Sequence, residues 1–137
     1  MQNRQSVHIL LPHPPTALNP NGNRAHYMRV SAARKKARAI AAAATLDHLN
    51  TESPCPLTAE EAPAYYATRH TTPTTYRIIW NHWGTQQPDD DNVVARIKSY
   101  KDGICQLIGI NDKNLRLRGV DFIRDKTTAK TLTLIIE

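Results

Sequence analysis

The 137-residue sequence has 18 lysines and arginines against 12 acidic residues, which gives a formal charge of +6 at pH 7. Its 40% hydrophobic and 22% charged residues are typical of a folded globular domain and exclude wholesale disorder. No apolar run approaches the roughly 18 residues of a membrane span, and two cysteines exclude a disulfide framework. We therefore expect one soluble domain, without a signal peptide, in a reducing compartment.

Charge is spread unevenly along the chain. No aspartate or glutamate occurs from Met1 to Leu46, a segment that is rich in lysine and arginine. A segment of one sign usually contacts a polyanion such as the phosphates of DNA, although a solvated helix face is the simpler alternative. The residues predicted to contact DNA are Arg24, Arg29, Arg34, Lys35, Lys36 and Arg38.

The first half of the chain predicts one strand and one helix. Ser6–Leu11 predicts a strand that ends at the prolines following it, and Thr16–Tyr27 predicts a loop. A helix is expected over Ser31–Leu49, with its serine as the N-cap. Its apolar stripe comprises Ala33, Ala37, Ile40, Ala44 and Leu49. Thr51–Thr75 is rich in proline and threonine and predicts a surface excursion with one turn at Thr58–Glu61.

The second half predicts three strands and a helix. Tyr76–Trp83 predicts a strand, and the acidic run after it opens a helix that ends at Ile108, before Gly109. Two further strands, Leu115–Ile123 and Thr131–Ile136, are expected to be joined by the polar hairpin Arg124–Lys130. The order β-α-β-α-β-β predicts a small α+β domain with a mixed sheet and two main helices packed on it.

Three consecutive aspartates, Asp89, Asp90 and Asp91, stand where the second helix begins. One aspartate suffices to cap a helix, whereas three repel one another and need a cation or a basic partner. At about 100° per residue, Lys98 and Asp102 fall within about 20° of Asp91, so the three share an outward stripe. A plain ion pair is the simpler interpretation of Lys98 and Asp102. The buried face is expected to comprise Val93, Ile97, Tyr100, Ile104 and Leu107.

A further aspartate, Asp112, lies in the turn after this helix, where aspartate is also an ordinary turn former. Whether it reaches Asp89 and Asp91 depends on the fold. If it does, three carboxylates converge without cysteine or histidine, a ligand set that suits Mg²⁺ or Mn²⁺.

These residues resemble the RusA family of Holliday junction resolvases. The resemblance rests on Asp89-Asp90-Asp91-Asn92, on Lys98 and Asp102 in the helix, and on Asn111-Asp112 after it. The opening Leu11-Pro12-His13-Pro14-Pro15, the loop Leu18-Asn19-Pro20-Asn21 and the basic helix also fit, so the similarity covers most of the chain apart from Thr51–Thr75. The chain departs from the family in a helix about one turn longer, in Asn111 where aspartate is common, and in Gln86-Gln87-Pro88 before the motif.

The resemblance implies that Asp89, Asp91 and Asp112 are catalytic and bind Mg²⁺, with Mn²⁺ as a substitute. It implies Lys98 as the catalytic lysine, with Arg96 as the alternative. It also implies a homodimer, without a membrane partner, that cuts branched DNA during recombination and repair in the cytoplasm of a bacterial or phage-infected cell. Two alternatives stay open: a non-catalytic, structure-specific DNA-binding protein of prophage origin, and a metal-dependent phosphatase or nucleotidase.

Overall fold

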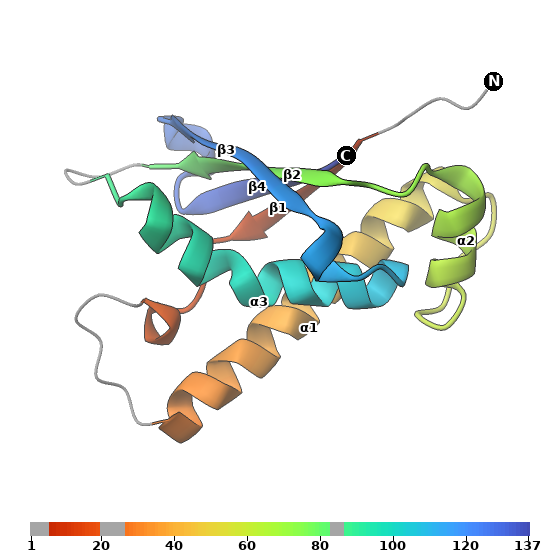
Figure 1. The fold of residues 1–137 in the computed structure, drawn as a ribbon, viewed down its shortest axis with the longest axis horizontal. Coiled ribbons are helices and arrows are strands. Elements are labelled where there is room, and N and C mark those ends of the chain that lie inside the picture. Colours follow the sequence, from red (N-terminus) through yellow and green to blue (C-terminus); the bar gives the residue numbers. More distant parts are fainter. Residues whose placement is uncertain (1–5, 20–26, 83–86) are drawn as a thin grey trace.

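The computed structural model describes residues 6–19, 27–82 and 87–137. Within these ranges the chain folds as one α+β unit, as the sequence predicts. Its strands and helices are β1 (Val7–Pro12), α1 (Tyr27–Glu52), α2 (Ala62–Arg69), β2 (Thr75–Asn81), α3 (Asp90–Ile108), β3 (Arg116–Ile123) and β4 (Thr131–Ile136). The helices lie against one face of the sheet, with α1 and α3 crossing beneath it (Figure 1).

The four strands form a mixed sheet in the order β1-β4-β2-β3. Strand β4 is antiparallel to both β1 and β2, whereas β2 and β3 are parallel. The predicted hairpin between the last two strands is therefore wrong, because β2 lies between them. The reason is burial: Ile135 and Ile136 are consecutive and both buried, so β4 takes an inner position, whereas β3 is largely exposed and forms an edge.

The segment between β3 and β4 is held by Asn81, at the end of β2. Its amide nitrogen donates to the carbonyl oxygens of Asp125, at 2.9 Å, and Thr128, at 2.6 Å. Its amide oxygen accepts from the Asp125 N–H at 3.0 Å. Asn81 is 1% exposed, so these bonds satisfy a buried amide and fix the path of the segment.

Helix α1 begins earlier than predicted. Ser31 lies inside the helix, four residues after Tyr27, so its expected role as the N-cap is wrong. The preceding Tyr-Met-Arg-Val run carries no turn former and continues the helix. The loop predicted before it falls largely on residues 20–26, outside the described residues. The residues that α1 buries are Ala37, Ala41, Thr45 and Leu49, four apart, whereas Ala33, Ile40 and Ala44 of the predicted stripe are half-buried.

Helix α2 was not predicted and corrects the expectation of a surface excursion over Thr51–Thr75. The expected turn is present before it: Thr58 donates its backbone N–H to the carboxylate of Glu61 at 3.0 Å. Proline indicates a break inside a helix but is tolerated in its first turn, where Pro63 stands. The helix packs because Ala62 and Tyr66, four residues apart, are both buried.

Helix α3 follows the prediction closely. It runs from Asp90 to Ile108, and Gly109 after it has a φ of 75°, the left-handed conformation that ends many helices. The five residues predicted to form its buried face are all buried. Trp80 of β2 is 2% exposed and belongs to the core beneath this helix, whereas Trp83 lies outside the described residues.

Candidate nucleic-acid site between helices α1 and α3

The outward stripe of α3 carries the predicted polar side chains. Asp91 and Lys98 are exposed, and Asp102 is partly covered, with 28% of its side chain accessible against 70% for Lys98. The Lys98 Nζ lies 3.4 Å from the Asp102 Oδ2, one turn further along the helix. A pair this exposed adds about 0.3–0.5 kcal/mol to stability, so its geometry positions the ammonium group more than it stabilises the fold.

This stripe borders a groove of about 600 Å³ between α3, the N-terminal half of α1 and the short turn Thr16–Leu18. The polar lining residues are Asn19, Arg34, Arg38, Lys98, Ser99 and Asp102. Three cationic side chains from two helices thus share one groove with a single carboxylate. The arrangement favours an anionic ligand, and a groove open to solvent suits a phosphate on a polymer.

A glycine sets the distance between the two helices. A Cβ on Gly103 would collide with the carbonyl oxygen of Arg38 and lie 2.9 Å from its Cα. Ala37 and Ala41, both fully buried, supply further small side chains along the same face of α1. This close approach brings Arg38 of α1 and Asp102 of α3 to the lining of the same groove.

The acidic run at the start of α3 is exposed. Asp89 precedes the helix in an extended conformation, yet its side chain makes no capping hydrogen bond. Asp90 and Asp91 occupy the first turn, where they complement the helix dipole. Within the described residues these three carboxylates have no hydrogen bond or ion pair from a side chain, so capping explains only part of their presence.

Asn92 links this end of α3 to the turn that borders the groove. Its amide nitrogen donates to the side-chain oxygen of Asn19 at 3.2 Å. Its own amide oxygen is buried and has no partner among the residues that the structure describes. Both asparagines stand in the stretches on which the resemblance rests, but the sequence does not predict this contact between them.

Asp112 lies at the opposite end of α3 from Asp89 and Asp91. It begins the short turn Asp112–Asn114, and the 19-residue helix between them spans about 28 Å. The three carboxylates therefore do not converge within one copy of the described chain. No group of three histidine, cysteine, aspartate or glutamate side chains in these residues is placed to hold a metal ion.

The topology gives the physical reason for this separation. Strands β2 and β3 are parallel, so α3 must carry the chain back along the full length of the sheet. Asp89 follows the carboxyl end of β2, whereas Asp112 precedes the amino end of β3. The turn that holds Asp112 therefore leads into the far end of the neighbouring strand, which answers the question that the sequence leaves open.

Arg96, the alternative to Lys98, faces the interior. Its guanidinium carbon lies 5.0 Å from the centre of the Trp80 ring, and its Nη2 donates to the Pro14 carbonyl oxygen at 3.4 Å. The tryptophan ring also stacks on His13, with 4.2 Å between ring centres. Burial lowers the pKa of Arg96, an effect that the neighbouring Tyr100 opposes. Lys98 is the cation of α3 that reaches the groove.

The remaining predicted DNA contacts gather on α1. Arg29, Lys35 and Lys36 are exposed, as is Arg34 at the groove, and Arg38 is half-buried. Arg24 lies outside the described residues. Because the first acidic residue of α1 is Asp47, the N-terminal half of this helix presents only positive charge.

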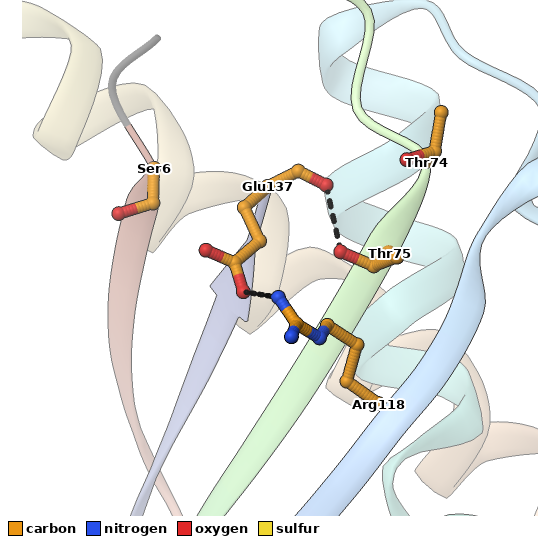
Figure 2. A pocket seen from close by; sticks show the side chains of 5 residues that line it. All are labelled: Ser6, Thr74, Thr75, Arg118 and Glu137. Atoms are coloured by element: carbon orange, nitrogen blue, oxygen red, sulfur yellow. Dashed lines mark hydrogen bonds and ion pairs between the residues drawn. The ribbon is translucent and has the colours of Figure 1, made fainter.

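A second pocket, of about 230 Å³, lies at the end of the sheet where β2 begins and β4 ends (Figure 2). Its cation, Arg118, is directed at the Glu137 carboxylate, 3.5 Å away, and the Thr75 hydroxyl donates to the Glu137 carbonyl oxygen at 3.0 Å. Since Glu137 offsets the charge of this arginine, the groove between α1 and α3 is the better candidate for an anion.

No model of a known protein family matches this chain, and no curated protein does. Within the described residues, no helix combines the length and the apolar character that crossing a membrane requires.

Proposed function

We propose that this protein is a Mg²⁺-dependent endodeoxyribonuclease that cuts four-way DNA junctions by phosphodiester hydrolysis, in DNA recombination and repair. The observation that carries the proposal is the groove in which Lys98 and Asp102 of α3 share a lining with Arg34 and Arg38 of α1. The resemblance to RusA resolvases supports the choice of a junction as the substrate.

The charges favour a phosphodiester as the ligand. Arg34 and Arg38 provide donors for non-bridging phosphate oxygens, and the exposed lysines of α1 extend positive charge along the neighbouring backbone. Asp89 and Asp91 would repel the same phosphates unless a cation neutralised them. Basic and acidic groups on adjoining surfaces therefore fit a phosphate-binding protein that also binds a divalent metal.

Asp89 and Asp91 are the proposed metal ligands. Their carboxylates are exposed and unpaired within the described residues, and Mg²⁺ characteristically binds one or two protein carboxylates together with substrate phosphates. When bound, the metal would lower the pKa of a coordinated water and offset negative charge on the reacting phosphate. Mn²⁺ has the same ligand preference and is the proposed substitute.

Lys98 is the proposed source of positive charge at the scissile phosphate. Its ammonium group is steadied by Asp102 at 3.4 Å and opens into the groove. Charge developing on the phosphate oxygens would be stabilised by this group, an effect of about 3 kcal/mol by comparison with oxyanion donors. Asp102 acts as a positioning residue in this proposal.

We further propose that the active form is a homodimer, since paired cuts across a junction require two sites. Asp112 belongs to a metal site in this proposal only when a second copy supplies it. Mixing the Asp91→Asn and Asp112→Asn variants tests this directly. Activity restored in the mixed dimer supports a shared site, whereas two inactive variants that stay inactive when mixed contradict it.

The proposed function is tested by incubating a labelled four-way junction and a linear duplex of the same sequence with Mg²⁺ or with EDTA. We expect paired nicks on the junction alone, and none with EDTA. Asp47→Asn, which removes an exposed carboxylate from the C-terminal half of α1, is the matched control and should cut normally. Junction binding without cleavage under Mg²⁺ or Mn²⁺ would contradict catalysis.

The main alternative is a non-catalytic, structure-specific DNA-binding protein of prophage origin. It is favoured by α1, whose basic residues supply phosphate contacts without any contribution from the carboxylates. Both proposals predict junction binding, so metal-dependent cleavage is the property that separates them.

A further inference from the structure

Helix α1 continues beyond the core at its N-terminal end. Its first buried residue is Ala37, so the segment from Tyr27 to Lys36 contributes no buried side chain. Figure 1 shows this end of α1 extending away from the sheet. At its tip, Tyr27 is 75% exposed and Met28 is 62% exposed. An aromatic ring at the tip of a basic helix therefore keeps most of its surface accessible.

The ring stands in line with the groove. At about 100° per residue, Arg34 and Arg38 lie within about 20° of Tyr27 around the axis of α1. Both arginines line the groove between α1 and α3, as does Val30 on the turn after Tyr27. Tyr27 is about 10 Å from Arg34 along the helix, so it extends the wall of the groove outward.

An aromatic ring beside a cationic groove is the arrangement by which proteins hold unpaired nucleotides. The bases stack on the ring while the groove binds the phosphates. The only charges on the segment from Tyr27 to Lys36 are positive, which favours a nucleic acid. A membrane-surface helix needs a long apolar face. The exposed residues that follow Tyr27 and Met28 in the sequence, up to Lys36, are instead arginine, lysine, serine and alanine.

We infer that Tyr27 stacks on an unpaired base of branched DNA whose phosphate lies in the groove between α1 and α3. The inference rests on the proposed function, because it takes DNA as the ligand of that groove. It adds a source of selectivity: bases inside a linear duplex are already stacked, whereas a branch point offers bases that can leave their stack. Tyr27 therefore discriminates between a junction and a duplex.

The test is the binding of a four-way junction with 2-aminopurine at its branch point, measured in EDTA so that no strand is cut. We expect Tyr27→Ala to weaken junction binding about tenfold and to abolish the fluorescence change at the branch. Tyr27→Phe keeps the ring and should bind within about twofold of the wild type. Leu10→Ala, which removes an exposed apolar side chain from β1, is the matched control and should bind normally. Circular dichroism verifies that each variant is folded.

Three outcomes separate this inference from the proposed function. If the wild type and Tyr27→Ala bind the junction equally, the inference is overturned and the proposed function stands. If the wild type binds neither the junction nor a linear duplex, both are overturned. If Tyr27→Ala loses binding to vesicles of anionic phospholipid while its DNA binding is unchanged, the ring contacts a membrane surface and the inference is wrong.

Discussion

The contact between Gly103 and α1 permits a quantitative prediction. An alanine methyl at position 103 would meet three backbone atoms of Arg38, the nearest being its carbonyl oxygen. Backbone atoms cannot rotate out of the way as a flexible side chain can, so α1 and α3 would have to move apart. Overpacking of this kind costs about 1–3 kcal/mol. Replacing glycine by alanine inside a helix also stabilises the helix by about 1 kcal/mol, because alanine has the higher helix propensity. Because all three contacts are with backbone atoms, the upper part of the overpacking cost applies, about 2–3 kcal/mol, and the net effect of Gly103→Ala is a loss of about 1–2 kcal/mol from the free energy of unfolding.

The assay is reversible unfolding by urea and by heat. For a domain of this size the loss corresponds to a fall in Tm of about 5 °C. Gly119→Ala is the matched control, because a Cβ at that position would meet nothing within 4 Å. It should leave stability unchanged or slightly raised. If Gly103→Ala is as stable as Gly119→Ala, the helices do not approach as described and the geometry assigned to the groove is wrong.

Three further predictions concern single side chains. Lys98→Ala should lower the single-turnover rate of junction cleavage about 100-fold, whereas Lys101→Ala, whose ammonium group lies 4.8 Å from the Tyr76 ring, should change it little; equal losses would contradict the role of Lys98. Arg34→Ala should weaken binding to all DNA substrates and reduce the slope of log affinity against log salt by about one, and an unchanged slope would exclude a phosphate contact. Burial lowers the pKa of His13 below 6.5, so the unfolded chain binds this proton more readily and stability falls as the pH drops through that value. His13→Gln should reduce the difference in Tm between pH 7.5 and 5.5, and an unchanged difference would contradict this assignment.

Local signals were sufficient to predict α3 and its two faces. An acidic first turn, aliphatic residues at helical spacing and a glycine after Ile108 agree with one another, and the helix has nearly the predicted bounds. The helical repeat of about 3.6 residues also predicts correctly that Ile97 is buried while its neighbour Lys98 is exposed. The strands were located for a similar reason, since each is a short apolar run between turn residues.

The pairing of the strands depends on contacts between distant parts of the chain, which local signals do not encode. Position in the sheet is decided by burial, and the run Leu134–Ile136 was the available sign that β4 is an inner strand. The same limit applies to the site. The separation of Asp112 from Asp91 follows from the parallel pairing of β2 and β3, and the approach of Arg38 to Asp102 follows from Gly103 in another helix.

The most direct test of the proposed metal-dependent cleavage compares binding and cutting of one four-way junction by the wild type and by Asp91→Asn, in Mg²⁺. We expect the variant to bind the junction with at least the affinity of the wild type and to cut none of its strands, since the proposed role of Asp91 is to hold the metal and its carboxylate otherwise repels phosphate. Cleavage at the wild-type rate would contradict the assignment of Asp91 to the metal site.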